Sequence, residues 1–429
     1  MRVVVTNAVE AKLDTEKMKP INVAYVLHRF PSLTETFVAE EIRSVENLGV
    51  KVQLYSLLPP RTDVVHPVSA ELVPQTCYAP ELYTPSLWAA QLHFLRKRPK
   101  EYLTWLWRML AEPAPRVDFL LKRLVVFVKG VWVARQLESS SVQLIHTHFA
   151  WLSAAACVVA AQLLNLPLTI TAHAYDIYSR KNDLLSLTTS MAARVVTISE
   201  YNKQAILERC ADLKPQRIEV IRCGIDLGQF QREDGDSARS AFQITAVGSL
   251  LEKKGHEILI RACRELEAQD LDFECVIVGK GPLEECLRRL VHELDLDGRV
   301  MLAGGQTQTW VRNRLGASDL FALACKVEGT GERDGIPVAL MEALAMEIPV
   351  VTTPVSGIPE LIRHEETGLL IPEGAPDALA AAVLRLAGDK TLSQQIGARG
   401  RAVVKEEYDI HKNSARLVRL FRDVIEGPG

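Results

Sequence analysis

The sequence predicts an α/β protein made of two domains, each with a parallel sheet. The chain of 429 residues is longer than one hydrophobic core usually serves, and 48% of its residues are apolar, enough for two cores. Strand-like apolar runs alternate with helical stretches, first over residues 21–57 and again from residue 242. Strands that alternate with helices form parallel sheets. Residues 231–241 are polar without a hydrophobic period, as expected of a linker.

The composition excludes several classes of protein. A net charge of −3 gives no general attraction to nucleic acid, so any basic character must be local. The eight cysteines are scattered without C-x-x-C or metal-ligand spacing, which fits a reducing compartment. Glu10 comes too early for a signal peptide, and the longest weakly polar run, residues 150–164, is too short to span a bilayer. We therefore expect a soluble, cytoplasmic chain.

The first domain, residues 1–230, opens with a βαβ unit. The apolar runs 21–27 and 50–57 predict two strands. A helical pattern of apolar residues lies between them, and Ser32 or Thr34 is well placed to cap that helix.

Residues 59–141 interrupt the alternation with sequence that is first proline-rich and then basic and aromatic. Basic amphipathic helices with tryptophan are typical of proteins on an anionic membrane surface. The alternative is that the tryptophans pack into the core while the lysines and arginines are solvated. We favour the membrane. The residues concerned are Trp88, Phe94, Arg96, Lys97, Arg98, Lys100, Trp105, Trp107, Arg108, Arg116, Lys122, Arg123, Phe127, Lys129, Trp132 and Arg135.

Two further strands of this domain end in histidine. The runs 144–149 and 167–176 carry His146, His148 and His173 near their C-terminal ends. Ligands gather at that edge of open α/β sheets. A histidine at a strand end is more often structural than catalytic, so the residues alone leave both roles open.

The second domain, residues 242–405, repeats the alternation of strands and helices and precedes a basic amphipathic helix. Predicted strands are 242–247, 275–278, 300–305, 319–323 and 350–352, and predicted helices include 376–388 and 410–425.

Glycines and lysines follow the first two strands of this domain. Gly248 is followed by Lys253 and Lys254 at a strand-to-helix junction, a composition that suits a diphosphate, although lysine pairs in turns are usually only solvated. Gly279 and Gly281 form a G-x-G after the next strand, which lacks the third glycine of a dinucleotide fingerprint.

The stretch 333–353 carries the strongest sign of a ligand. Gly335 and Pro337 lead into a helix that is apolar at every position but one, Glu342. Helix N-termini attract phosphate, and a carboxylate two turns behind can accept hydrogen bonds from a ribose or sugar. Glutamate early in a helix is also favoured by the helix dipole alone, and Asp334 could be an ordinary loop residue. The residues therefore leave a nucleotide-sugar site and a plain helix start both open.

These residues also resemble a known family. An acidic residue, seven residues and glutamate, from Asp334 to Glu342 within Gly-Ile-Pro-Val-Ala-Leu-Met-Glu-Ala-Leu-Ala, resemble the E-x7-E signature of the retaining family 4 glycosyltransferases. The wording from Gly331 resembles the exopolysaccharide (colanic acid) branch. Aspartate stands at 334 where the family usually has glutamate. The resemblance covers roughly residues 21–425.

The resemblance implies the GT-B fold, in which two Rossmann-like doubly wound domains face each other across a cleft. It implies that the last helix, within residues 406–429, returns to the first domain. It also implies a metal-independent, retaining transfer with no cofactor besides the nucleotide-diphosphate sugar itself. In agreement, no acidic residues occur at metal-ligand spacing, so we expect no metal.

Residue roles follow from the same resemblance. Glu342 would hold the donor ribose, Asp334 the donor sugar and Lys254 the diphosphate, while Ser249 stands where the family has arginine. His173, in Thr-Ala-His-Ala, resembles the histidine that lies against the transferred sugar. Expected catalytic residues are His173, Asp334 and Glu342; expected donor-binding residues are Gly248, Ser249, Lys253, Lys254, Gly279, Gly281, Gly335, Ile336, Pro337, Val338 and Glu342; expected acceptor-side residues are Arg29, Ser32, Thr34, Glu35 and His148.

The implied function is transfer of a hexose to a saccharide acceptor, expected to be lipid-linked, in bacterial exopolysaccharide or lipopolysaccharide biosynthesis. The chain would act at the inner face of the plasma membrane as a peripheral protein and would bind no nucleic acid. Two alternatives stay open: another GT-B enzyme, such as an epimerase or phosphorylase, and a catalytically weak sugar-binding or scaffold protein. The substitutions at Asp334 and Ser249 are the best support for the second.

Overall fold

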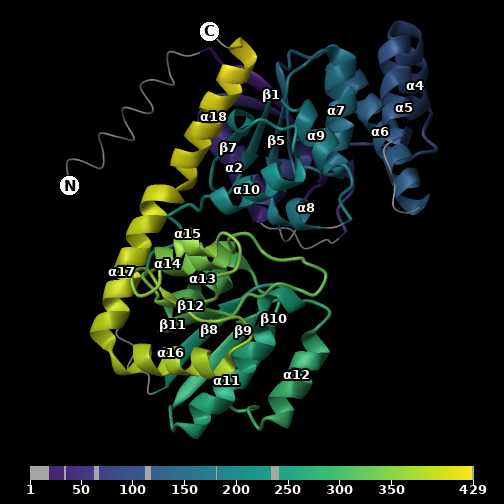
Figure 1. Ribbon diagram of the computed structural model, residues 1–429. Helices are drawn as coiled ribbons and strands as arrows, with labels where there is room; N and C mark the ends of the chain where they lie inside the picture. The colour runs from purple at the N-terminus through teal and green to yellow at the C-terminus, as the bar shows by residue number, and fades with distance from the viewer. Residues whose placement is uncertain are drawn as a thin grey trace. The chain divides into compact units, whose positions relative to one another are not determined.

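Two parallel sheets organise the chain, as the alternation of strands and helices predicts. The computed structural model describes residues 19–32, 35–61, 67–111, 117–179, 181–232 and 241–427. The chain divides into a first unit, residues 1–221 with 411–429, and a second unit, residues 222–410 (Figure 1).

The first unit contains a seven-stranded sheet in the order β3-β2-β1-β4-β5-β6-β7, with every pair parallel. This is the doubly wound arrangement, in which the chain winds outward from β1 in both directions. Its elements are β1 (Ile21–Arg29), α2 (Thr36–Asn47), β2 (Val50–Leu58), α3 (Pro67–Leu72), η1 (Val73–Gln75), β3 (Thr76–Tyr78), α4 (Pro85–Lys97), α5 (Pro99–Ala111), α6 (Val117–Leu137), β4 (Leu144–His148), α7 (Leu152–Leu164), β5 (Leu168–Ala172), α8 (Ala174–Tyr178), α9 (Leu185–Met191), β6 (Arg194–Thr197), α10 (Glu200–Arg209), η2 (Pro215–Arg217), β7 (Ile218–Val220) and α18 (Ile410–Glu426).

The central strands of this sheet, such as β4 and β5, are buried on both faces, as expected of parallel strands between helices. In β1, Val23, Ala24, Tyr25 and Val26 are all fully buried, which explains why this strand shows no alternation of apolar and polar residues. Helix α18 belongs to this unit because its apolar side chains, among them Phe421, share a core with β1 and α2.

The segment 59–141 is only partly an insertion. Its strand β3 pairs with β2 and forms the edge of the sheet, which the sequence analysis missed because the strand has three residues. The remainder forms helices α3 to α6. Trp105 and Trp132 are buried in the core, so their inclusion in a membrane-facing surface was wrong, whereas Trp88 and Trp107 are exposed.

The start of helix α2 also differs from the prediction. The residue that precedes the helix is Glu35, and no side chain caps the first turn. Ser32 lies three residues before Glu35, and its carbonyl accepts a hydrogen bond from the Glu35 amide at 3.3 Å, so Ser32 begins a turn that precedes the helix. The position before the helix is Glu35 and not Ser32. Thr34 lies outside the described residues.

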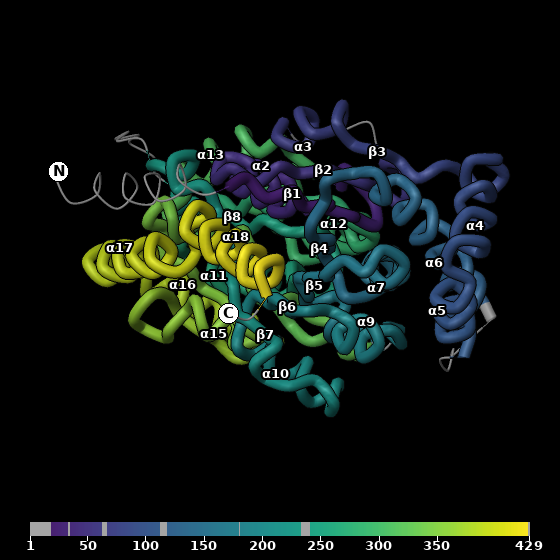
Figure 2. Tube along the Cα trace, turned by 90° about the horizontal axis from the view of Figure 1, so that it is seen from above, coloured from purple at the N-terminus to yellow at the C-terminus, as the bar shows by residue number. Residues whose placement is uncertain are grey.

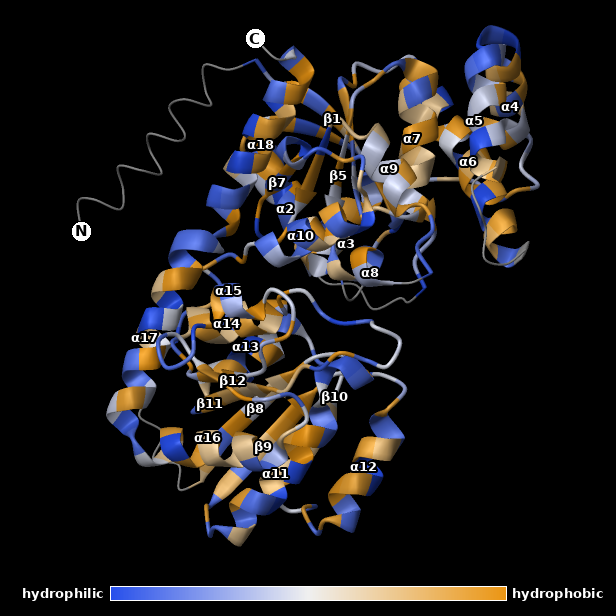
Figure 3. Ribbon diagram, in the orientation of Figure 1, coloured by the Kyte–Doolittle hydropathy of each residue, from blue (hydrophilic) through white to orange (hydrophobic). Residues whose placement is uncertain are grey.

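The second unit contains a six-stranded parallel sheet in the order β10-β9-β8-β11-β12-β13, the same doubly wound pattern. The five predicted strands correspond to β8–β12, and the predicted helix 376–388 is α16. Figure 3 shows the strands of both sheets mainly in the colour of apolar residues. The elements are β8 (Phe242–Val247), η3 (Glu252–Lys254), α11 (His256–Ala268), β9 (Phe273–Val278), α12 (Glu284–Glu293), β10 (Val300–Gly304), α13 (Gln308–Gly316), β11 (Leu320–Leu323), α14 (Val338–Ala345), β12 (Val350–Thr352), α15 (Ile358–Leu361), β13 (Leu369–Leu370), α16 (Pro376–Gly388) and α17 (Lys390–Glu407).

The division between the units falls after Ile221, earlier than the expected linker at 231–241, of which residues 233–240 lie outside the described part. Residues 222–230 therefore belong to the second unit. Arg222 forms ion pairs with Glu360 at 2.7 Å and Glu407 at 3.1 Å, and Ile225 forms a β-bridge with Asp409. Among the described residues, no helix is both long enough and apolar enough to cross a membrane.

Candidate functional site

Helix α14 in the second unit begins where the sequence predicts it. Pro337 precedes its first residue, Val338, and the loop residues Gly335 and Ile336 are buried with Pro337. The apolar run makes α14 an interior helix, with Leu340 and the residues that follow it packed in the core of this unit. Its amino-terminal end is therefore held rigidly next to the loop that carries Asp334.

Asp334 lies in that loop and is paired with both lysines of η3. Its Oδ1 is 3.0 Å from Lys253 Nζ, and its Oδ2 is 2.7 Å from Lys254 Nζ. The structure thus brings two adjacent lysines together with an aspartate that lies about 80 positions further along the sequence. They form one cluster, here called the lysine–aspartate cluster, with a formal charge of +1.

The charges of this cluster stabilise one another. Burial opposes ionisation of the Asp334 carboxyl, but Lys254 and Lys253 outweigh it and hold its pKa below the ordinary value. Burial likewise opposes the charge of Lys254, and Asp334 outweighs it, so the pKa of this lysine is raised. Both side chains are mostly buried, Lys254 at 13% and Asp334 at 14% exposure. The cluster is a fixed cationic group of the kind that binds phosphate.

Close packing of the backbone requires glycine at two positions next to the cluster. A side chain at Gly279 would place its Cβ 1.8 Å from the Gly248 carbonyl oxygen, and one at Gly281 would lie 2.5 Å from the Leu250 carbonyl oxygen. The loops after β8 and β9 thus run in direct backbone contact, with the Gly248 amide donating to the Val278 carbonyl at 2.9 Å. Ser249 lies in the same loop, half-buried. Close loop packing accounts for Gly279 and Gly281, and contact of this loop pair with a donor stays a prediction.

Glu342 lies in the second turn of α14 and is half-buried. Burial among apolar neighbours raises the pKa of its carboxyl to about 7, and the charge of Arg312 in α13 opposes that shift. Arg312 was not predicted. Its side chain also reaches the side-chain oxygen of Gln229 at 3.4 Å. A half-buried carboxyl with a raised pKa beside a cationic side chain fits a binding site, and the role of Glu342 in donor binding stays a prediction.

His256 follows η3 and is buried beside the lysine–aspartate cluster. Burial and the nearby charge of Lys254 lower the pKa of its imidazole to about 4, so the ring is neutral at physiological pH. This residue was also missed, because one histidine at the start of an amphipathic helix has no distinguishing pattern.

In the first unit, the three histidines of β4 and the end of β5 converge with Glu41 of α2. His148 Nδ1 lies 3.0 Å from His173 Nε2, and His148 Nε2 lies 3.1 Å from Glu41 Oε1. The Tyr25 hydroxyl donates to the same carboxylate oxygen at 3.1 Å. Parallel strands bring their carboxyl ends to one edge of the sheet, which is why β1, β4 and β5 meet here.

His173 is buried between aromatic rings. Its ring centroid lies 5.0 Å from that of Phe37, 4.7 Å from that of Phe149 and 5.3 Å from that of His148. Burial and the proximity of His148 hold the pKa of His173 well below its ordinary value, so the ring is neutral. The Asp176 carboxylate accepts from the His173 amide at 2.8 Å and fixes the turn that positions the histidine.

His146 supports this arrangement from two positions before His148 in β4. Its Nδ1 lies 2.8 Å from Thr169 Oγ1, and its Nε2 lies 3.8 Å from Glu41 Oε1. One ligand atom from each of Glu41, His146 and His148 lies within 4.8 Å of the others, a spacing that could hold a metal ion. Each of these atoms already has a protein neighbour, and our expectation of no metal stays a prediction.

The expected acceptor-side residues differ in burial and in their contacts. Arg29 is half-buried, and its guanidinium donates to the Pro59 carbonyl oxygen. Burial raises the pKa of the Glu35 carboxyl, against the opposing effects of His148 and of a hydrogen bond from Ser32. Glu35 and Ser32 thus lie near the histidine cluster.

Of the residues that the sequence analysis missed, Glu41 had a usable signal. It follows buried Val38 by three positions and precedes buried Ile42 and Val45, so helical spacing places it at the margin of the buried face. An acidic residue at that position needs a partner, and the histidines of β4 provide it. Arg312 and His256 had no comparable signal.

Two family models match the chain and together cover most of it. "Glycosyltransferase Family 4" matches residues 34–229, and "Glycosyl transferases group 1" matches residues 229–403. The junction between the two matches lies within residues 222–232 of the second unit.

Curated relatives agree with these matches. The amylovoran biosynthesis glycosyltransferase AmsK of Erwinia amylovora is 38% identical over 48% of this chain and 51% of its own length. The putative colanic acid biosynthesis glycosyltransferase WcaL of Salmonella typhimurium is 34% identical over 49% of this chain and 52% of its own. The matched part thus spans about half the length of these relatives.

Solved structures share the fold. Anabaena HepE, solved in complex with UDP, is 16% identical, with a TM-score of 0.70 over 94% of this chain and 100% of its own. The lipopolysaccharide outer core galactosyltransferase WaaB is 16% identical, with a TM-score of 0.63 over the same shares. At this identity the likeness supports the GT-B fold alone.

Proposed function

Because the chain belongs to the family 4 glycosyltransferases, we propose that it transfers a hexose from a nucleotide-diphosphate sugar to a saccharide acceptor. The observation that carries the proposal is the lysine–aspartate cluster, which fixes a net positive charge in the loop that leads into α14. A diphosphate leaving group needs such charge most in the transition state, when the bond to the sugar breaks.

The proposed roles of the second unit's residues follow from their chemistry. Lys253 and Lys254 offset the charge of the departing diphosphate, and Asp334 keeps both ammonium groups oriented. The backbone N–H groups in the first turn of α14, which follows the loop that carries Asp334, favour an anion. Glu342 accepts hydrogen bonds from the donor ribose, and Arg312 beside it favours the ionised carboxylate.

We propose that the transfer retains the configuration of the anomeric carbon. The acceptor oxygen would attack the face from which the diphosphate departs, and the acceptor proton would pass to the departing phosphate oxygen. His173 is assigned to the transferred sugar on its resemblance to the family histidine. Its neutral ring, oriented through His148, suits a hydrogen bond to a sugar hydroxyl better than it suits a fixed charge.

The acceptor class rests on the relatives. AmsK is named for amylovoran biosynthesis and WcaL for colanic acid biosynthesis, which agrees with the exopolysaccharide (colanic acid) branch that the sequence resembles. We propose a lipid-linked saccharide acceptor, exopolysaccharide or lipopolysaccharide synthesis as the process, and the inner face of the plasma membrane as the place of action, without a bound metal or further cofactor.

The test is a transfer assay with a panel of nucleotide-diphosphate hexoses and lipid-linked saccharides, with the product's anomeric configuration determined by NMR. The Lys254→Ala variant should lose transfer, and Lys390→Ala, an exposed lysine of α17, should keep it. Transfer with inversion would refute the retaining mechanism. Failure of every donor to bind or react would refute the proposed function and favour a scaffold protein.

A further inference from the structure

Helices α4 and α5 carry apolar side chains on two faces instead of one. The inner face of α4 includes Leu87 and Phe94, and that of α5 includes Trp105 and Met109, all buried. Each helix has a second apolar stripe, exposed, at spacing i, i+4 and i+7, which places its members on one face. These exposed residues are Trp88, Leu92 and Leu95 in α4 and Leu103, Trp107 and Leu110 in α5.

This second stripe is unusual for the chain. Among the described residues, twelve large apolar or aromatic side chains are exposed, and nine of them lie between residues 82 and 121. Trp107 is 68% exposed and Trp88 is 54% exposed. A soluble surface seldom gathers so many in one place unless it binds something.

The two helices form the outermost layer of the first unit. Both α4 and α5 pack on α6, and α6 packs on α7, which covers the sheet. Figures 1 and 2 show α4 and α5 at the edge of this unit, beyond α6. The indole N–H of Trp88 donates to the Leu82 carbonyl at 2.7 Å, which holds the ring on the outer face. No described residue of the first unit covers these two exposed stripes.

Basic residues accompany the stripes. Residues 85–111 contain five basic residues and a single acidic one, Glu101, in a chain whose net charge is −3. Three of the basic residues, Arg96, Arg98 and Lys100, lie at the turn from α4 to α5 and form no ion pair with any described residue. The charge of this face is therefore available to an anionic partner.

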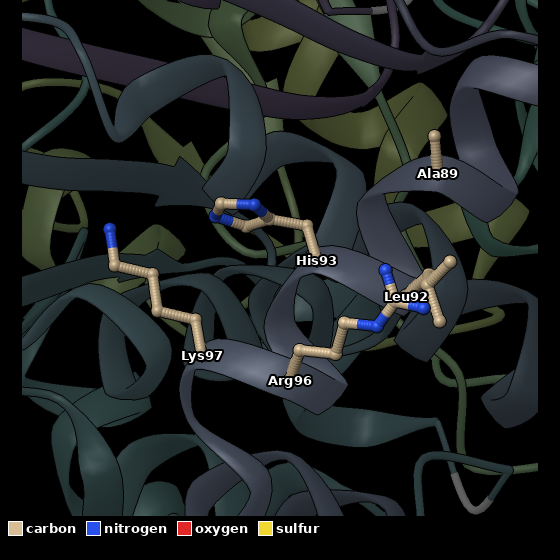
Figure 4. A pocket seen from close by; sticks show the side chains of 5 residues that line it. All are labelled: Ala89, Leu92, His93, Arg96 and Lys97. Atoms are coloured by element: carbon tan, nitrogen blue, oxygen red, sulfur yellow. The ribbon is translucent and has the colours of Figure 1, made fainter.

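A hollow on α4 combines the two properties. It has a volume of about 380 Å³ and is lined by Ala89, Leu92, His93, Arg96 and Lys97. Figure 4 shows the Arg96 guanidinium beside Leu92, with His93 and Lys97 on the other side of the hollow. Lys97 and His93 are engaged with Glu138 at 2.8 Å, which leaves Arg96 as the cation directed to solvent. An apolar floor with a cationic rim suits a phospholipid headgroup and the start of its chains.

We propose that the outer face of α4 and α5 docks on the surface of an anionic lipid bilayer, with the helices lying in the plane of the interface. Tryptophan and leucine enter the headgroup region while arginine and lysine contact lipid phosphates. A second copy of the chain fits this face less well, because a two-fold dimer pairs one patch with the same patch, and residues 85–111 hold five basic residues and one acidic residue. This surface places the proposed enzyme beside a lipid-linked acceptor, but it does not depend on that activity.

The experiment is co-sedimentation of the full chain with two kinds of vesicle. One kind is phosphatidylcholine alone, and the other contains about a third phosphatidylglycerol, which gives a strongly negative surface. One variant removes the aromatic anchors, Trp88→Gln with Trp107→Gln. A second removes the charges, Arg96→Gln with Arg98→Gln and Lys100→Gln. Its charge-matched control substitutes Gln for three exposed basic residues of the second unit, Arg261, Arg289 and Lys390.

The wild type and the control should bind anionic vesicles, and the charge variant should bind at least tenfold less, since each basic residue near the surface contributes roughly a factor of five. The tryptophan variant should lose the fraction that remains bound at 1 M salt, where the Debye length is only about 3 Å. Circular dichroism and nucleotide binding by each variant verify that both units remain folded.

Three results would overturn the proposal: no preference of the wild type for anionic vesicles, binding by both variants equal to wild type, or a concentration-dependent dimer that the tryptophan variant abolishes. The last would identify a second copy as the occupant. Because vesicle binding needs neither donor nor acceptor, its failure would leave the proposed glycosyl transfer untouched, and absent transfer would leave the docking surface untouched.

Discussion

Substitution of Glu342 by glutamine is the sharpest test of the second unit's site. Burial raises the pKa of this carboxyl to about 7, so its charge changes within the range in which the protein can be assayed. If the ionised form accepts hydrogen bonds from the donor ribose, nucleotide binding must be coupled to loss of the proton. Glutamine keeps the size of the side chain but neither the charge nor the titration.

The size of the change in nucleotide affinity follows from the pKa of Glu342. A group with a pKa of about 7 is roughly 90% ionised at pH 8 and roughly 10% ionised at pH 6, so affinity for a nucleoside diphosphate should fall about tenfold between them. A hydrogen bond to a charged group contributes about 1.5–3 kcal/mol, so Glu342→Gln should weaken binding at pH 8 by roughly 10- to 100-fold. The variant's own affinity should not change with pH through this group.

Isothermal titration calorimetry of both proteins with UDP and GDP between pH 6 and pH 8 measures these quantities. The Arg312→Ala variant is an informative companion. Loss of the nearby cation should raise the pKa of Glu342, so the pH at which nucleotide affinity falls should be higher in this variant than in the wild type. Equal pH dependence in wild type and Glu342→Gln, or normal affinity in the variant, would show that Glu342 has a structural role only.

The same pKa determines the effect on stability. The folded-state pKa lies above the unfolded value of 4.5, so this group stabilises the fold fully below pH 4.5, and the contribution is lost as the pH rises through 7. At about 1.4 kcal/mol for each pH unit the difference amounts to about 3 kcal/mol, and screening by water at the half-buried side chain reduces it to about 2 kcal/mol. Glu342→Gln should therefore equal or exceed the wild type in thermal stability at pH 8, and a collapse of stability there would contradict the reasoning.

Three further predictions concern the other charged groups. Lys254→Ala leaves Asp334 with one lysine, so nucleotide affinity should fall at least tenfold and stability by about 1–2 kcal/mol; calorimetry and urea unfolding measure both, and unchanged affinity would exclude the diphosphate role. Glu41→Gln should lower kcat about tenfold and leave the donor KM unchanged, because Glu41 orients His148, which in turn orients His173. Glu40→Gln is the matched control. If Glu41 were purely structural, the variant would lose thermal stability without lowering kcat at constant KM. EDTA should leave activity unchanged, and a loss restored by a divalent cation would instead point to the Glu41 and histidine cluster as a metal site.

The sequence was a good guide to the fold because parallel sheets have a strong local signature. Strands such as β8 and β12 are short, mostly apolar and separated by helices, and the predicted bounds match the structure closely. Strand β3 could not be found this way, because three residues carry no measurable period and its pairing with β2 depends on a partner distant in the sequence. The same holds for the two faces of α4 and α5, since sequence periodicity identifies apolar stripes but does not say which stripe the rest of the fold covers.

The sequence predicted which residues make up the candidate sites but not which of them contact each other. Asp334 and Lys254 were recognised from separate motifs as contacts of two different parts of a donor, the sugar and the diphosphate. In the structure they contact each other, together with Lys253. Charge pairs between distant loops depend on the three-dimensional approach of those loops, which no local pattern encodes.

That pairing gives a physical account of the two departures from the family pattern. Aspartate at 334 is one methylene shorter than the usual glutamate, and a shorter carboxylate needs its partners close by; Lys253 and Lys254 lie at 3.0 and 2.7 Å. Serine at 249 removes one positive charge from the same loop, and two lysines around one carboxylate leave a net positive charge there. If both lysines serve the diphosphate, Lys253 takes over the electrostatic part of the missing arginine, and the substitutions at 249 and 334 are compatible with an active transferase.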